Sequence, residues 1–312
     1  MKRSLLVIAG PTGVGKTATT VALAARVPLE VISADSRQVY RGMDLATGKP
    51  SPAERRAVTH HLIDVVDPDD RYHAARFHAD AQALVADIHE RGHLPAVVGG
   101  TGFYIRALLR GLDPAPPADP GFRRELAALA TREGRTALHA RLLHEAPELA
   151  RRLHPNDEVR VVRALERFRV QGAAASEQVR WAQPASSYDA VYVGLTMERA
   201  ALRRRLADRA AVMVAAGLAE EVRGLLGRGY DPTLPAMQGI GYRQFVQVVQ
   251  GTLAAGDALR LMQRDTMRYA RRQWTWFARE PDVQWLDLGL AGGPEGAAAI
   301  IERRLREGGL IR

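Results

Sequence analysis

The stretch LLVIAGPTGVGKT, residues 5–17, decides the fold of this chain. Its apolar half predicts a buried first strand, and its second half has the G-x-x-x-x-G-K-[ST] pattern of a phosphate loop that opens a helix. In that setting backbone N–H groups and the helix dipole face a diphosphate. Lys16 is expected to reach the terminal phosphate oxygens and Thr17 to ligate Mg²⁺. The residues predicted to bind the diphosphate are Gly10, Pro11, Thr12, Gly13, Val14, Gly15, Lys16 and Thr17.

Beyond this loop, short apolar runs alternate with helical patterns. Strands are expected at 5–9, 29–33, 61–66 and 96–98, and helices at 16–27 and 73–91. Strands separated by helices of this length form a parallel sheet with right-handed crossovers. Four prolines within residues 113–120 then predict a boundary, because proline continues neither a helix nor a central strand.

The pattern after this boundary is helical over 121–171. A strand follows at 190–195, then helices at 199–226 and 257–278 and a last strand at 283–288. The predicted fold class is α/β: a P-loop NTPase-like parallel sheet core flanked by helices, with an inserted all-helical domain. The core is assigned to 1–113 and 190–312 with the C-terminal helices, and the insertion to 114–189.

Composition excludes several classes of protein. The chain has no Cys, which excludes disulfide scaffolds and thiolate metal sites and fits the cytoplasm. No stretch reaches the ~20 apolar residues that span a bilayer, so a soluble protein without membrane contact is expected. The net charge is +9, and residues 199–279 hold 14 Arg against 6 acidic residues. This excess indicates a polyanionic partner; a solvated helix surface is the alternative.

Lysine is rare in this chain. Only Lys2, Lys16 and Lys49 occur among the 44 basic residues. Because arginine's planar fork cannot replace a compact ammonium where space is tight, an internal lysine kept in such a chain indicates a chemical requirement.

The loop predicts a diphosphate without saying which one. Most such proteins cleave ATP or GTP and hold Mg²⁺ through a carboxylate at the end of another strand. The strand at 96–98 ends instead in Gly99-Gly100-Thr101-Gly102, and Asp64 and Asp67 are weaker candidates. A nucleotide or small-molecule kinase and a non-catalytic RNA-binding ATPase therefore stay open as alternatives.

Further motifs resemble one family, the bacterial tRNA dimethylallyltransferases, also called isopentenyltransferases. Besides the phosphate loop they are SADSRQVYRGMD at 33–44, TGKP at 47–50, HHLID at 60–64, VGGTGFY at 98–104, HPND at 154–157 leading to Arg160 and RALE at 163–166, GIGYR at 239–243 and RRQWTWF at 271–277. They run in family order over nearly the whole chain. The resemblance implies transfer of a dimethylallyl group from its diphosphate to the exocyclic N6 amine of the adenosine 3′ to the anticodon, with Mg²⁺ and with diphosphate released.

The resemblance also implies roles for four catalytic residues. Asp35 would be the general base, a role that an ionised carboxylate after the second strand can fill; a turn or N-cap aspartate is the alternative. Lys16 and Arg209 would neutralise the departing diphosphate, with Arg205 one helical turn before Arg209. Thr101 would hydrogen-bond near the target base. The base must leave its stack, so a through-channel with two mouths is expected.

Contacts with the tRNA anticodon stem-loop are implied at five places, and a monomer is expected. Glu166 shares a helix face with Arg160 and Arg163, so an ion pair is the alternative there. Trp274 and Phe277 are spaced like a helix core stripe and are predicted to be buried. The implied tRNA contacts are Asp35, Ser36, Arg37, Gln38, Thr101, Arg123, Val159, Arg160, Val161, Val162, Arg163, Gln238, Gly239, Ile240, Gly241, Tyr242 and Arg243.

Overall fold

The computed structural model describes residues 2–112, 119–172 and 186–311. The chain divides into two compact units: unit 1 comprises Met1–Arg110 and Ala185–Arg312, and unit 2 comprises Gly111–Pro184. The predicted boundaries lie a few residues later, at 113/114 and 189/190. Most of the proline-rich run that suggested the first boundary falls outside the described residues.

Unit 1 is built on a six-stranded, wholly parallel sheet in the order β3-β2-β4-β1-β5-β6. The predicted α/β class with a P-loop NTPase-like core is thereby confirmed. The strands are β1 (Ser4–Ala9), β2 (Leu29–Ala34), β3 (His60–His61), β4 (Leu94–Gly99), β5 (Asp189–Thr196) and β6 (Gln284–Asp287).

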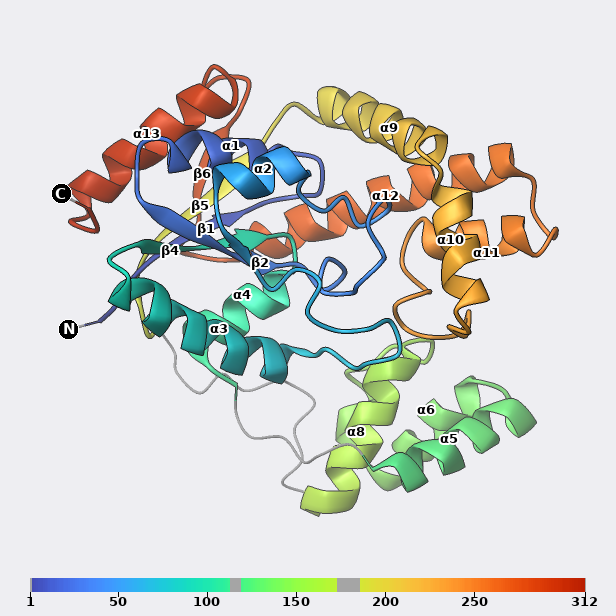
Figure 1. The fold of residues 1–312 in the computed structure, drawn as a ribbon. Coiled ribbons are helices and arrows are strands. Elements are labelled where there is room, and N and C mark those ends of the chain that lie inside the picture. Colours follow the sequence, from blue (N-terminus) through green and yellow to red (C-terminus); the bar gives the residue numbers. More distant parts are fainter. Residues whose placement is uncertain (1, 113–118, 173–185, 312) are drawn as a thin grey trace. The chain divides into compact units, whose positions relative to one another are not determined.

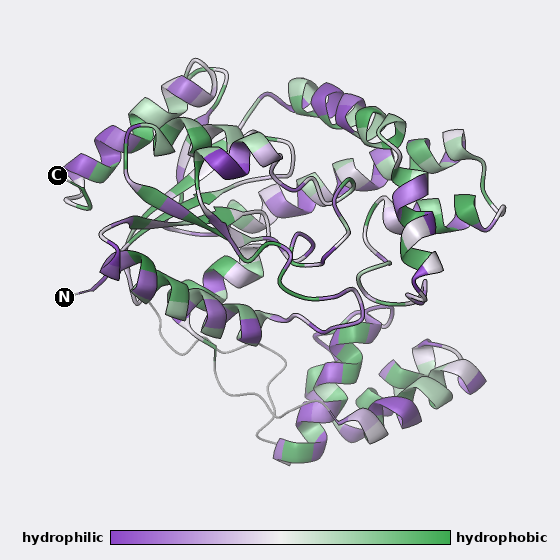
Figure 2. Cartoon of the chain, viewed as in Figure 1, coloured by the Kyte–Doolittle hydropathy of each residue, from purple (hydrophilic) through white to green (hydrophobic). Residues whose placement is uncertain are grey.

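The central strands are apolar on both faces, as strands buried between two helical layers must be. Along β1, Leu5 and Val7 belong to one core and Leu6 and Ile8 to the other. Figure 1 shows α1 (Lys16–Ala24) and α13 (Gly293–Glu307) on one face, and α3 (Ala74–Glu90) and α4 (Gly102–Arg110) on the other. In Figure 2 these strands are mostly green, whereas the helices alternate between green and purple.

The remaining helices of unit 1 are α2 (Pro52–Ala57), α9 (Arg199–Ala215), α10 (Leu218–Gly227), α11 (Tyr242–Val249) and α12 (Ala255–Phe277). The helix predicted at 199–226 is therefore two helices. They are separated at Gly217, whose φ of 101° is a left-handed conformation that only glycine adopts easily. Within the described residues, no helix combines the length and the apolar character needed to cross a membrane.

The strand predicted at 61–66 is wrong in its length, because β3 contains only His60 and His61. Leu62 and Asp64 have φ values of 61° and 58°, so the chain turns away from the sheet directly after the strand. Val66 then makes an isolated bridge with Tyr40. Ion pairs formed by Asp64, described below, hold this turn.

Unit 2 is helical throughout its described residues, with α5 (Pro120–Glu133), α6 (Thr136–Glu145), α7 (Pro147–Ala150) and α8 (Glu158–Gln171). The Asp119 side chain caps α5 by accepting the Phe122 N–H at 2.9 Å, and Pro120 is the first helical residue. Phe122, Leu142 and Leu165 belong to a separate apolar core. Unit 2 therefore has the core of a small helical domain.

Candidate active site

Three loops meet at the carboxyl edge of the sheet because their strands end at the same level. Gly99 at the end of β4 pairs with both Ala9 of β1 and Ala34 of β2. Neighbouring strands lie about 4.8 Å apart, so the phosphate loop after β1 and Asp35 after β2 are about 10 Å apart across β4. In an open parallel sheet this edge is where ligands bind.

The phosphate loop forms the floor of a cavity of about 300 Å³, here called the phosphate-loop cavity. Its cationic side chains are Lys16, Lys49, Arg205 and Arg209, and its acidic ones are Asp35 and Glu54. No hydrogen bond within the described residues engages the backbone N–H groups of Gly13, Gly15, Lys16 or Thr17. Four unsatisfied N–H groups at a helix N-terminus, facing several cations, form an anion site.

Lys16 lines this cavity. Its ammonium donates to Gly10 O at 3.0 Å and Pro11 O at 2.9 Å. Burial lowers the pKa of Lys16 to about 8, against the opposing effect of the Asp35 carboxylate and with a smaller lowering by Arg209. Burial also lowers the pKa of Arg209, whose guanidinium donates to Gly48 O at 3.3 Å. Both groups are poorly solvated cations, which an anion would stabilise.

Asp35 stands in a turn that fixes one of its two carboxylate oxygens. Oδ1 accepts the N–H groups of Arg37 at 2.8 Å and Gln38 at 3.3 Å, the geometry of an aspartate that caps its own turn. Oδ2 has no hydrogen-bond partner among the described residues. The turn reading and the general-base reading are therefore compatible, since one oxygen serves the fold and the other is available for chemistry.

A second cavity of about 280 Å³, here called the α12 cavity, lies on the other side of Asp35. Apolar side chains of α9 and α12, among them Leu206, Met213 and Met262, line it together with the Tyr269 ring. Of the residues implied as tRNA contacts, it contains Asp35, Ser36, Arg37, Gln238, Gly239, Ile240, Tyr242 and Arg243. Gln38 lines the phosphate-loop cavity instead, and Gly241 lines neither.

The two cavities share a wall. Thr12, Asp35, Thr47 and Arg209 line both of them. A group held by the phosphate loop and a group held in the α12 cavity can thus meet at the same carboxylate. The arrangement offers two adjacent spaces with one shared carboxylate, and a continuous channel with two mouths stays a prediction.

Thr101 lies behind the Asp35 turn and lines neither cavity. Its hydroxyl accepts the Ser36 N–H at 3.1 Å, and its own N–H donates to Ala34 O at 3.1 Å. Thr101 thereby joins the end of β2 to the start of α4. Thr101 positions the turn that carries Asp35, and its hydrogen bond near the target base stays a prediction.

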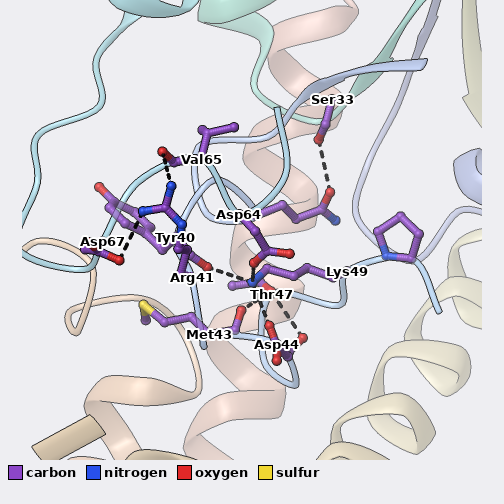
Figure 3. A network of polar contacts seen from close by, with 12 residues as sticks. Ser33, Tyr40, Arg41, Met43, Asp44, Thr47, Lys49, Asp64, Val65 and Asp67 are labelled. Carbon is purple, nitrogen blue, oxygen red and sulfur yellow. Dashed lines mark hydrogen bonds and ion pairs between the residues drawn. The ribbon is translucent and has the colours of Figure 1, made fainter. Parts of the chain in front are cut away.

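Lys49 is held by three hydrogen-bond acceptors in a polar network, which Figure 3 shows. Its ammonium donates to Tyr40 O at 2.7 Å, Asp44 Oδ1 at 2.6 Å and Asp64 Oδ1 at 2.5 Å, and only 4% of the side chain is exposed. Three acceptors match the three donors of an ammonium, which an arginine fork would not fit.

The same network engages the two carboxylates considered as magnesium ligands. Asp64 also pairs with Arg55 at 2.9 Å, and Asp67 pairs with Arg41 at 3.2 Å. Neither aspartate lines the phosphate-loop cavity. The carboxylate that an ATP-cleaving relative would need at a strand end is therefore not supplied by Asp64 or Asp67.

Lys49→Met is expected to lower the free energy of unfolding by about 3 kcal/mol, because it leaves the partly buried Asp64 carboxylate with less charge compensation. Urea unfolding followed by circular dichroism measures this change. Arg56→Met, at an exposed position on α2, is the matched control and should change stability by less than about 0.5 kcal/mol. Equal stability of the two variants would contradict the structural role of Lys49.

Comparison with known proteins decides the family. The family model described as IPP transferase matches residues 38–280. The chain belongs to the IPP transferase family. It is 45% identical to tRNA dimethylallyltransferase 2 of Geotalea uraniireducens over 96% of this chain and 95% of that protein. It is 47% identical to the tRNA dimethylallyltransferase of Symbiobacterium thermophilum over 98% and 96%.

Solved structures agree with this membership. The tRNA isopentenylpyrophosphate transferase of Bacillus halodurans superimposes with a TM-score of 0.73 at 39% identity, over 99% of this chain and 98% of that one. A eukaryotic dimethylallyltransferase, described as acting on tRNA, gives a TM-score of 0.70 at 27% identity over 91% and 74%. No observation favours the kinase alternative over membership in the IPP transferase family.

In this IPP transferase family member, several basic residues of unit 2 form ion pairs. Glu166 accepts from Arg123 at 2.6 and 2.9 Å and from Arg163 at 3.0 Å, and Asp157 pairs with Arg160. The ion pair considered as the alternative for Arg163 is therefore present. The Val161 side chain is fully buried in the unit 2 core and cannot contact RNA, whereas Val159 is 80% exposed and Val162 is partly buried.

The sequence of this family member predicted only part of what α12 contributes to the two cavities. Phe277 is buried as predicted, but Trp274 is 50% exposed, and its burial was predicted wrongly. Tyr269 and Gln273 reach the two cavities and were not singled out. Gln273 stands inside the RRQWTWF motif, so the motif itself was the available signal. No pattern marked Tyr269.

Proposed function

We propose that this chain transfers a dimethylallyl group from dimethylallyl diphosphate to the exocyclic N6 amine of the adenosine 3′ to the anticodon in tRNA, and releases diphosphate. The observation that carries the proposal is the position of Asp35, which lines both the phosphate-loop cavity and the α12 cavity. Membership in a family whose relatives are named tRNA dimethylallyltransferases supports the reaction class.

The phosphate-loop cavity would hold the diphosphate. Free backbone N–H groups of the loop bind its oxygens, and Lys16, Arg205 and Arg209 offset its charge. Charge neutralisation is what an allylic diphosphate requires, because negative charge accumulates on the leaving oxygen.

Magnesium fits the same cavity. The Thr17 hydroxyl lines it and makes no hydrogen bond within the described residues. A hydroxyl, together with phosphate oxygens and water, supplies the oxygen ligands that Mg²⁺ takes. When bound, the ion would add positive charge against the diphosphate.

The transfer step uses groups on both sides of the shared wall. The bond between C1 of the dimethylallyl group and the diphosphate oxygen breaks, and its electron pair stays on the diphosphate. The N6 lone pair forms the new bond to C1. Nitrogen becomes positively charged, and its proton passes to Asp35 Oδ2.

The α12 cavity would receive the adenine. Single-stranded loops allow a base to leave its stack at a cost of a few kcal/mol. The Tyr269 ring, with the Arg272 guanidinium 5.8 Å from its centre, and the methionines of α9 and α12 give this cavity an apolar surface suited to a base. Exposed Arg160 and Val159 of unit 2 are proposed as contacts with the anticodon stem-loop. The enzyme acts as a cytoplasmic monomer in this proposal.

A nucleoside assay tests the proposal. The protein is incubated with dimethylallyl diphosphate, Mg²⁺ and unmodified tRNA, and the tRNA is digested and examined by mass spectrometry. We expect one adenosine, 3′ to the anticodon, to gain the mass of a dimethylallyl group. ATP turnover without modified adenosine would support a kinase and contradict the proposal.

The pH dependence of diphosphate binding follows from Lys16. Its pKa in the free protein is about 8, below the ordinary value of 10.5, so the cation that an anion needs is present below pH 8 and is lost above it. The affinity for dimethylallyl diphosphate is expected to be level near pH 7 and to fall by up to tenfold per pH unit above pH 8. Calorimetric titration measures this slope, and Lys16→Ala should lack it. A wild-type slope equal to that of Lys16→Ala would assign the dependence to another group.

A further inference from the structure

Gln273 of α12 reaches the phosphate loop and joins it to the turn after β4. The Thr12 N–H donates to Gln273 Oε1 at 2.8 Å, and Gln273 Nε2 donates to Gly100 O at 2.9 Å. The residue is only 5% exposed and lines the phosphate-loop cavity. The single Gln273 amide therefore links α12 to the phosphate loop and to the turn after β4, which are distant from one another in the sequence.

Gly100 gives this amide its space. A Cβ atom added at Gly100 would lie 2.1 Å from Gln273 Nε2, closer than real side chains approach. The glycine and the glutamine therefore fit one another, and the amide is held in one place rather than free to swing out of the cavity.

The bridge has a consequence for the phosphate loop. Such loops bind phosphates through successive backbone N–H groups. Here the Thr12 N–H already donates to an uncharged acceptor, whereas those of Gly13, Gly15, Lys16 and Thr17 have no partner in the described part of the chain. The Val14 N–H donates to Pro11 O within the loop at 3.3 Å. The cradle is therefore closed at Thr12, and its open N–H groups are those of Gly13, Gly15, Lys16 and Thr17.

We propose that Gln273 sets the length of the phosphate cradle and so favours a diphosphate over a triphosphate. The inference rests on the proposed function, in which the loop holds a prenyl diphosphate. A third phosphate placed towards Thr12 could not accept the Thr12 N–H, because that group already donates to Gln273. Its oxygens would also face the Gln273 Oε1 atom, and two hydrogen-bond acceptors repel one another. Proteins often gain specificity by placing an unfavourable contact against the wrong ligand.

The test compares two anions that carry neither a base nor a prenyl group, inorganic diphosphate and tripolyphosphate, by calorimetric titration with Mg²⁺. Gln273→Ala frees the Thr12 N–H and is expected to raise the ratio of tripolyphosphate to diphosphate affinity by about tenfold, the effect of one hydrogen bond to a charged group. Gln273→Glu keeps an acceptor on Thr12 and adds charge, so it should lower the ratio.

Gln263→Ala is the matched control. Gln263 is on the same helix, donates to Ala207 O at 3.1 Å and lines neither cavity, so the ratio should not change. If both Gln273 variants lost affinity for the two anions equally, Gln273 would only hold the loop in place, and the inference would be overturned. Opposite shifts cannot come from general loosening. Failure of the nucleoside assay would leave the anion ratio unaffected, so the two ideas fail separately.

Discussion

Asp35→Asn is expected to slow dimethylallyl transfer by about 10²- to 10⁴-fold, the usual contribution of a general base. Asparagine keeps an oxygen that can accept the Arg37 and Gln38 N–H groups, so the turn should persist. Its amide cannot take the proton that leaves N6. Single-turnover transfer with saturating tRNA measures the chemical step directly.

The binding measurements separate this role from a structural one. Affinities of Asp35→Asn for tRNA and for dimethylallyl diphosphate should stay within about threefold of wild type, since no charged contact to either is removed. The assay is run near pH 7, because the Asp35 charge is what raises the pKa of Lys16 against its burial. Asp69→Asn, an exposed position that lines neither cavity, is the control and should transfer normally. Transfer above a tenth of the wild-type rate in Asp35→Asn would remove Asp35 as the base.

The phosphate loop and the sheet could be predicted because their signals are local. An apolar run, a Gly-rich loop and a helix stand within residues 5–27, and each strand of the sheet except β3 was marked by its own apolar run. The parallel arrangement follows from the helices between them. Local patterns also placed Asp35 after the second strand, and the paired ends of β1, β4 and β2 then bring it beside the loop.

Long-range ion pairs could not be predicted in this way. The run at 61–66 is as apolar as a strand, but Asp64 pairs with Lys49 and Arg55 and the chain turns after His61. Glu166, expected to face Arg163 within one helix, also pairs with Arg123 from α5. Such pairs depend on which helices pack together, and a period along the chain does not report that.

Helix α12 shows the limit most clearly. Its spacing predicted Trp274 and Phe277 on one buried face, yet only Phe277 is buried. The same helix sends Gln273 into the phosphate-loop cavity and Tyr269 into the α12 cavity. An amphipathic pattern identifies which face is buried, but it does not distinguish a face packed on a core from one that borders a ligand space.

Lys16→Ala is expected to lower transfer by about 10³-fold, because it removes a preorganised cation where charge develops on the leaving diphosphate. Affinity for dimethylallyl diphosphate should fall with it. Affinity for tRNA should change by less than about threefold, since Lys16 lines the phosphate-loop cavity and not the α12 cavity. Filter binding of labelled tRNA at fixed salt, beside calorimetric titration of the diphosphate, gives both values.

Arg243→Ala supplies the reverse case. Arg243 lines the α12 cavity and pairs with Asp265 at 2.6 Å, and it does not line the phosphate-loop cavity. Its loss should weaken tRNA binding and its salt dependence while leaving diphosphate affinity near wild type. The two variants together test whether the cavities divide the substrates between them. If Lys16→Ala weakened tRNA binding as strongly as diphosphate binding, one space would serve both substrates. The proposal that Asp35 lies between two separate substrate sites would then have no basis.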